Sequence, residues 1–190
     1  MFYWFIRNIL WVLFRIIFRI RTTGKEHLPK SGAFILCGNH LSALDPIVLA
    51  ICTKRQLFFM GKKELFQVKI FGTALRAMGA FPVDRAATDM SAYRHALDVL
   101  KNDRSLVIFS QGTRMKDFEG AKSGAALFAL KSGAPIVPVG IATSYRLFSS
   151  VNINFGPPIY MDEYADRKVR TELVEEVMAT VVEKVTELAR

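Results

Sequence analysis

The sequence has few of the residues that build metal sites and disulfide frameworks. Its 190 residues include only two cysteines, Cys37 and Cys52, and three histidines. Both cysteines lie in apolar runs, so we expect reduced core residues in a protein that faces the cytosol. No spacing of cysteine and histidine matches a zinc site, and neither a metal nor a prosthetic group is expected. A nucleophilic Cys37 acting with His40 remains an alternative.

Acidic residues are scarce relative to basic ones. There are 26 Lys and Arg against 17 Asp and Glu, which gives a net charge of +9. This excess indicates an anionic partner, and three classes provide one: nucleic acid, an acidic lipid surface or a phosphorylated small molecule. The 51% hydrophobic content excludes a disordered chain. The length suits one domain core rather than two.

The hydrophobic runs are shorter than a membrane-spanning helix requires, so a spanning helix is disfavoured. In the aromatic-rich segment 1–21, the longest stretch without charge after Arg7 is residues 8–14. A spanning helix needs about 18 apolar residues. A signal peptide is also disfavoured, because the arginines lie within and after the apolar run and no small-residue cleavage site follows.

Segment 1–21, wound as one helix at about 100° per residue, has two faces. One arc of about 160° contains both tryptophans and the polar residues Arg7, Asn8, Arg15, Arg19 and Arg21. The opposite arc carries no charge and consists of Phe2, Phe5, Ile6, Ile9, Leu10, Leu13, Ile16, Ile17 and Ile20. This pattern is typical of a helix lying in a membrane interface, with its arginines at the lipid phosphates. A spanning helix, and a helix packed on the protein's own core with solvated arginines, stay open as alternatives.

The rest of the chain alternates short apolar runs with helical periodicity. We expect strands at 33–37, 57–60, 80–83, 105–109, 135–142 and 151–156. We expect helices starting near 45, within 63–79, after a cap at Thr88 or Asp89, over 122–133 with a glycine at the end, and from about 166 onward. Apolar strands separated by helices predict a single α/β layered domain with a mostly parallel sheet flanked by helices. Ligand sites in such folds lie at the carboxyl ends of the strands.

His40 follows the first of these strands, and Asp45 comes five residues later, just before Pro46. On a continuous helix the two side chains would point about 140° apart, so a helix would not pair them. A loop that turns back could pair them, with Asp45 at the helix cap and Pro46 at the first helical position. The spacing therefore fits both a helix cap and a base with its orienting carboxylate.

Two further strand ends carry arginine. Arg85 follows strand 80–83, where it is either a ligand-binding residue or a solvated partner of Asp84. Gly112, Thr113 and Arg114 follow strand 105–109, and a glycine, a hydroxyl and a guanidinium fork suit a phosphate. A tight turn with a surface arginine is the alternative. The nearby sequence does not fit a nucleotide-binding P-loop, and the chain has no G-x-S-x-G element of a serine hydrolase.

Four short blocks in this order resemble the glycerolipid acyltransferase family, which includes the 1-acylglycerol-3-phosphate acyltransferases. The blocks are "NHLSALD" with the H-x-x-x-x-D motif, "GAFPVDR", "FSQGTR" and "VPVGI". The similarity runs from about Thr23 through Ile141 and is weaker beyond. The sequence departs from the family where Gln111 replaces the usual glutamate and Ser110 the usual proline. Gln111 keeps a carbonyl acceptor and loses the charge, so a role that needs a carboxylate there is in doubt.

The resemblance implies a role for each matching residue. His40 would be the general base and Asp45 its orienting partner. Arg85, Gly112, Thr113 and Arg114 would hold the phosphate of the acceptor. Lys62, in "GKKELF", matches a family lysine that would assist them.

The implied reaction transfers a fatty acyl group from a thioester of acyl carrier protein or coenzyme A to the free sn-2 hydroxyl of lysophosphatidate, forming phosphatidate. Glycerol-3-phosphate or another lysophospholipid is the alternative acceptor, and a non-catalytic basic module that binds membrane or nucleic acid is a remote one. We expect a membrane-interface helix over 1–21 and an acyltransferase domain over 22–190. The protein is expected at the cytoplasmic face of a membrane, as a monotopic or peripheral protein on an anionic surface, without nucleic acid.

Overall fold

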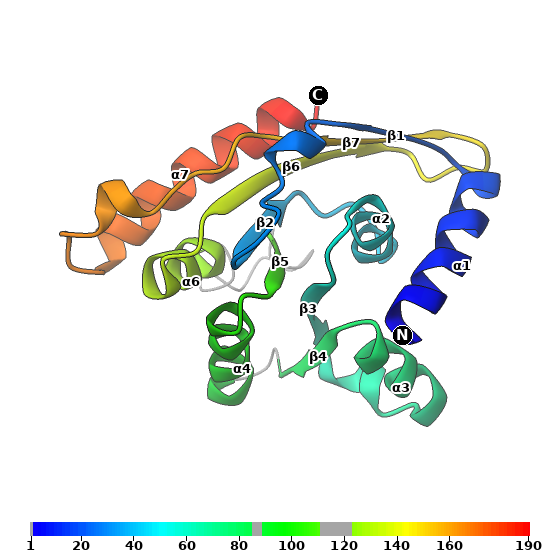
Figure 1. Cartoon of the computed structure of the whole chain (residues 1–190), viewed down its shortest axis with the longest axis horizontal. Coiled ribbons are helices and arrows are strands. Elements are labelled where there is room, and N and C mark those ends of the chain that lie inside the picture. Colours follow the sequence, from blue (N-terminus) through cyan, green and yellow to red (C-terminus); the bar gives the residue numbers. More distant parts are fainter. Residues whose placement is uncertain (1, 85–88, 111–122) are drawn as a thin grey trace.

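A seven-stranded sheet forms the centre of the protein (Figure 1). The computed structural model describes residues 2–84, 89–110 and 123–190. Across the sheet the strands are β1 (Arg19–Thr23), β7 (Ser150–Phe155), β6 (Ile136–Thr143), β2 (Phe34–Gly38), β5 (Ser105–Phe109), β3 (Leu57–Lys62) and β4 (Ala80–Val83). All neighbouring pairs are parallel except β6 and β7, which are antiparallel. The predicted α/β fold with a mostly parallel sheet is confirmed.

Helices cover both faces of the sheet (Figure 1). One face carries α1 (Phe2–Ile17), α2 (Asp45–Cys52) and α3 (Lys69–Ala77), and the other carries α4 (Met90–Lys101), α6 (Gly124–Ser132) and α7 (Thr171–Leu188). The short 3₁₀ turns are η1 (Lys25–His27), η2 (Lys63–Phe66) and η3 (Asp162–Tyr164). Strand β2 serves both layers, because Ile35 and Cys37 join the core under α4, α6 and α7 while Phe34 and Leu36 join the other core. A strand buried on both faces is apolar at every position, as this one is.

Two helix ends follow their predicted signals. The Asp89 side chain accepts hydrogen bonds from the backbone N–H groups of Ser91 and Ala92, so Asp89 caps α4. Helix α6 ends at Gly133, whose φ of 74° lies in the left-handed region that glycine adopts without strain. Asp89 therefore sets the start of α4, and Gly133 sets the end of α6.

The N-terminal segment differs from the expected single helix. Helix α1 ends at Ile17, and Arg19 and Arg21 lie in β1, which pairs in parallel with β7. Exposed and half-buried residues alternate along "RIRTT", which is the period of a strand with one face covered. The expectation that these two arginines extend the helical arc is therefore wrong. Two charged side chains on an edge strand also discourage pairing with another chain.

Helix α1 packs one side on the domain and leaves another exposed. Tyr3 and Phe14 are buried against α2 and the sheet. Arg7 also faces inward, because Nε donates to the carbonyl of Ala50 at 3.0 Å and Nη2 donates to those of Ile51 and Thr53 at 3.0 and 2.6 Å. Arg7 thus satisfies the carbonyls at the end of α2 and does not reach outward as expected.

The exposed side of α1 is apolar. It consists of Phe2, Phe5, Ile9, Val12, Leu13 and Ile16. Trp4, Trp11 and Arg15 flank it, with the Arg15 guanidinium 4.6 Å from the centre of the Trp11 ring. No helix in the ranges that the structure describes combines the length and the apolar character needed to cross a bilayer.

Candidate active site

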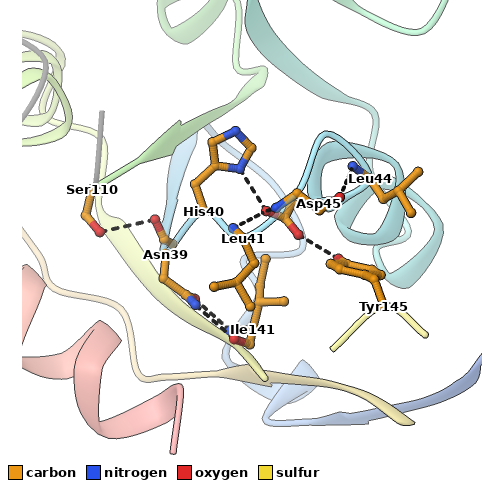
Figure 2. Close-up of polar contacts among 10 residues, drawn as sticks. Asn39, His40, Leu41, Leu44, Asp45, Ser110, Ile141 and Tyr145 are labelled. Carbon is orange, nitrogen blue, oxygen red and sulfur yellow. Dashed lines mark hydrogen bonds and ion pairs between the residues drawn. The ribbon is translucent and has the colours of Figure 1, made fainter. Parts of the chain in front are cut away.

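The loop 39–44 folds back so that His40 and Asp45 meet. Strand β2 ends at Gly38 and α2 begins at Asp45, so both residues lie at the carboxyl end of a central strand. His40 Nδ1 lies 2.7 Å from Asp45 Oδ2 (Figure 2). A loop therefore brings together His40 and Asp45, which a continuous helix would hold apart, and the expected His–Asp pair is present.

Asp45 is fully buried, and its carboxylate is surrounded by donors. Oδ2 accepts from the backbone N–H groups of Leu41 and Ser42 at 2.6 and 2.8 Å, in addition to His40, and Oδ1 accepts from the Tyr145 hydroxyl at 2.6 Å. Burial raises the pKa of this carboxyl group, but the hydrogen bonds from His40, Ser42, Tyr145 and Leu41 outweigh it and leave the pKa below its ordinary value. Asp45 is therefore ionised at neutral pH.

The alternative interpretation of Asp45 as the cap of α2 is wrong. The residue that precedes the helix is Leu44, and no side-chain hydrogen bond caps the first turn. Asp45 is itself in the first turn, followed by Pro46, and its carboxylate points back to the loop. The carboxylate thus stabilises the loop that carries His40, because it accepts hydrogen bonds from two backbone N–H groups of that loop.

The His40 ring is held through Nδ1, and Nε2 has no hydrogen-bond partner among the described residues. Its ring stacks on Phe109 at the end of β5, with centroids 4.2 Å apart and planes 16° apart. The side chain is 26% exposed, and no described residue hydrogen-bonds Nε2. The ionised carboxylate at Nδ1 favours the tautomer with the proton on Nδ1, which leaves a lone pair on Nε2. This arrangement suits a general base.

The loop is tied to strands on both sides of β2. The Asn39 side chain forms two hydrogen bonds of 2.8 Å with the backbone of Ile141 in β6, one through each amide atom. On the other side, the Ser110 N–H donates to the Gly38 carbonyl at 2.8 Å, and its hydroxyl donates to the same carbonyl at 3.2 Å. Figure 2 shows these contacts around the pair. They fix the two ends of the connection between β2 and His40 to the neighbouring strands.

The residues expected to bind phosphate are only partly described. Arg85, Gly112, Thr113 and Arg114 lie outside the described residues, as does Gln111. Lys62 ends β3, two strands from β2, with Nζ 3.5 Å from Glu64 and more than half of its side chain exposed. The structure does not bring Lys62 into contact with the His–Asp pair.

The last described residues before these gaps are well fixed. Ser110 is hydrogen-bonded to Gly38 beside the loop of His40. The Asp84 N–H donates to Asp89 Oδ2 at 3.0 Å. Strands β2, β5, β3 and β4 are adjacent and parallel, so Ser110 and Asp84 lie at the same edge of the sheet as His40.

Three contributors were missed from the sequence. Tyr145 reaches Asp45 across 100 positions, Asn39 reaches Ile141 across 102, and Phe109 stacks on His40 from another strand. Asn39 has one local signal, since it follows a strand and precedes the motif histidine. Nothing in the spacing of Tyr145 or Phe109 points to the pair.

The cysteines are core residues, as expected. Cys37 and Cys52 are buried and unbridged, and burial raises the pKa of their thiols to about 12 and about 11. Neither thiol supplies a thiolate at neutral pH, which removes Cys37 as a nucleophile. The described residues contain no group of three His, Cys, Asp or Glu that could hold a metal ion.

Comparison with known proteins identifies the class. The family model described as Acyltransferase matches residues 19–142, which include the His–Asp pair, β2 and most of the sheet. The chain belongs to this family.

Relatives within the family are named more specifically. A 1-acyl-sn-glycerol-3-phosphate acyltransferase of Streptococcus pneumoniae is 37% identical over 93% of this chain and 69% of its own length. One from Bacillus subtilis is 31% identical, over 86% of this chain and 85% of its own. The solved structure of the 1-acyl-sn-glycerophosphate acyltransferase PlsC of Thermotoga maritima matches with a TM-score of 0.72 and 25% identity, over 99% of this chain and 82% of that one.

Proposed function

We propose that this chain is a 1-acylglycerol-3-phosphate O-acyltransferase, which transfers a fatty acyl group from a thioester to the sn-2 hydroxyl of lysophosphatidate. The observation that carries the proposal is the buried Asp45 carboxylate holding His40 Nδ1 at the carboxyl edge of the sheet, where no described residue hydrogen-bonds Nε2. The named relatives supply the acceptor, because proteins 30 to 37% identical to most of the chain act on 1-acyl-sn-glycerol-3-phosphate by name.

The chemistry of this pair follows from its geometry. His40 Nε2 takes the proton of the acceptor hydroxyl while its oxygen attacks the thioester carbonyl. Asp45 stays ionised, holds the imidazole orientation and stabilises the imidazolium that forms. When the tetrahedral intermediate collapses, the C–S bond breaks and the imidazolium returns the proton to the departing thiolate. The products are phosphatidate and a free thiol, and the donor is either an acyl carrier protein or a coenzyme A thioester.

Phosphate binding is assigned to the arginine-bearing segments. Arg85, Arg114 and the Gly112–Thr113 turn hold the acceptor phosphate, with Lys62 assisting. Support comes from the described neighbours of these residues in the chain, since Ser110 and Asp84 lie at the same sheet edge as His40. Arg114→Ala is expected to raise the acceptor KM by about tenfold to a hundredfold, as loss of a charged hydrogen bond does. Arg114→Lys is expected to restore only part of this, because a point charge does not replace a planar fork.

The exposed apolar side of α1 is assigned to the bilayer interface. Its six large apolar side chains face away from the sheet, with both tryptophans and Arg15 along one flank. This is the composition of an interfacial helix that places apolar groups among acyl chains and cations at phosphates. The protein is thus a peripheral or monotopic protein of the cytoplasmic face, with α1 as its membrane-interface segment. The expected boundary between residues 21 and 22 moves to before Arg19, because β1 belongs to the sheet of the acyltransferase domain.

An acyl-transfer assay tests the activity. Purified protein is given a radiolabelled acyl donor, as acyl carrier protein or coenzyme A thioester, with lysophosphatidate, glycerol-3-phosphate or lysophosphatidylcholine. The expected product is phosphatidate, with lysophosphatidate preferred. Preference for glycerol-3-phosphate or a neutral lysolipid would reassign the acceptor. Nucleic-acid binding without any transfer would replace the enzyme by a binding module.

A vesicle-binding assay tests the role of α1. The double change Ile9→Glu and Ile16→Glu places two charges on the exposed apolar side, and binding to phosphatidylglycerol vesicles is expected to fall by at least tenfold. Val182→Glu is the matched control, because Val182 is an exposed apolar residue of α7 on the opposite face of the sheet. Equal binding by the double variant and the control would remove α1 from the interface.

A further inference from the structure

The two oxygens of the Asp45 carboxylate have unequal support. Oδ2 accepts from His40 and from the backbone amides of Leu41 and Ser42, all within the loop and the start of α2. Among the described residues, Oδ1 accepts from the Tyr145 hydroxyl alone, at 2.6 Å (Figure 2). Because Asp45 is fully buried, solvent does not replace that donor. The Tyr145 hydroxyl is therefore the described group that stabilises Oδ1.

Tyr145 is held in an unusual backbone conformation to make this contact. Its φ of 50° lies in the left-handed region, which is unfavourable for a bulky side chain. Its N–H donates to the Thr143 hydroxyl at 3.0 Å, and its ring meets the edge of Phe18, with centroids 5.8 Å apart and planes 80° apart. The residue is thus fixed by its backbone hydrogen bond and by Phe18, which follows α1, and its hydroxyl points at Asp45.

The phenol is suited to donate and not to titrate. Burial and the hydrogen bond with Asp45 both raise the pKa of Tyr145. The other titratable group that acts on it is the Cys52 thiol of α2, whose own raised pKa keeps it neutral. Tyr145 therefore remains a neutral O–H donor at neutral pH.

We propose that Tyr145 is a positioning residue of the His–Asp pair, whose hydroxyl fixes the rotation of the Asp45 carboxylate and takes up part of its negative charge. It touches neither substrate nor the reacting atoms and acts through Asp45. The role rests on the proposed acyl transfer, in which Asp45 orients His40. With the hydroxyl present, the carboxylate offers Oδ2 to His40 in a fixed direction. Without it, Oδ1 loses its described donor, fewer donors take up the negative charge, and only the hydrogen bonds to Oδ2 hold the carboxylate.

Tyr145→Phe removes only the hydroxyl and gives two separate expectations. The plateau value of kcat is expected to fall about tenfold or more while the acceptor KM stays within about twofold, because orientation is lost and binding is not. The His40 titration, followed by NMR of a chain with three histidines, is expected to move upward by about 0.5 to 1 pH unit. The upward direction follows because the undispersed charge of Asp45 stabilises the imidazolium more strongly.

Controls separate this role from general stability. Tyr160→Phe removes a hydroxyl from an exposed tyrosine and is expected to change neither reading. If Tyr145→Phe unfolds, 3-fluorotyrosine incorporated at position 145 replaces it. Its phenol is a stronger donor, and the His40 titration is then expected to move downward.

The NMR titration does not depend on activity, so it separates the two proposals. A wild-type protein that transfers no acyl group overturns the proposed function, while the titration still reports on Tyr145. An unchanged or oppositely shifted His40 titration in the Tyr145 variant overturns the role of Tyr145, whatever the activity. A drop in unfolding temperature with unchanged titration and unchanged kcat shows that Tyr145 is a packing residue, and also overturns it.

Discussion

Asp45→Asn removes the charge of the His–Asp pair while keeping its shape. The asparagine oxygen can occupy the place of Oδ2, where it still accepts from Leu41, Ser42 and His40. The amide nitrogen then faces Tyr145, whose hydroxyl can rotate to accept a hydrogen bond where it now donates. We therefore expect a folded protein, destabilised by about 1–2 kcal/mol because charged hydrogen bonds become neutral ones.

Turnover is expected to respond much more strongly than stability. A neutral amide does not stabilise the imidazolium that forms when His40 takes the hydroxyl proton. General base catalysis contributes about 10²–10⁴-fold, and loss of the carboxylate in comparable triads costs about 10⁴-fold. We expect kcat to fall about 10³-fold or more, which corresponds to about 4 kcal/mol at about 1.4 kcal/mol per decade.

Asp45→Ala is the matched comparison. It leaves the amides of Leu41 and Ser42 and the Tyr145 hydroxyl without their buried acceptor, so it is expected to cost about 3–5 kcal/mol of stability. The assays are thermal unfolding and the thiol-release rate per folded molecule. A folded Asp45→Asn protein that keeps more than a tenth of wild-type kcat would refute the orienting role and leave Asp45 as a structural residue of the loop.

Three further predictions concern stability. Arg7→Ala is expected to lower the free energy of unfolding by about 2–4 kcal/mol, because three carbonyls at the end of α2 lose a charged donor. The kcat of the folded protein is expected to be retained. Urea unfolding checks the stability, and an acyl-transfer assay on the same protein checks kcat. Gly140→Ala is expected to cost about 3 kcal/mol by thermal unfolding, because a Cβ there would lie 2.1 Å from the Leu188 carbonyl carbon, and an unchanged unfolding temperature would contradict that approach of α7 to β6. The pKa of Asp45 is lower in the folded than in the unfolded chain, so its stabilisation is present above about pH 4 and is lost as the pH falls through the folded pKa. Urea titrations from pH 7 to 3 are therefore expected to show the stability gap between wild type and Asp45→Asn closing in acid, and a constant gap would contradict the lowered pKa.

Local pattern was sufficient for most of the sheet. Strands such as β2 and β5 are apolar at nearly every position and are bounded by turns, so their period and length identify them. Strand β1 was missed because "RIRTT" follows a helix directly and its arginines also fit a helical arc. The choice between the two depends on pairing with β7, which is more than a hundred residues away and has no local signal.

The pair itself was only half predictable. The spacing of His40 and Asp45 excludes a helix but does not specify the loop, which depends on Asn39 binding Ile141 and on Ser110 binding Gly38. Tyr145 could not be found by pattern, because its contact depends on the shape of the turn between β6 and β7. Arg7 was misplaced for a related reason. Amphipathic periodicity does not distinguish an arginine that faces phosphates from one that faces a helix end.

The turnover of His40→Ala tests the central claim most directly. The control is His95→Ala, which removes an exposed histidine of α4 and leaves the pair intact. With lysophosphatidate and an acyl thioester, the His40 variant is expected to lose about 10³-fold or more in kcat, while it stays folded at the assay temperature and its affinity for the acceptor matches that of the control. A folded His40→Ala protein that forms phosphatidate within tenfold of the wild-type rate would contradict general base catalysis by this histidine.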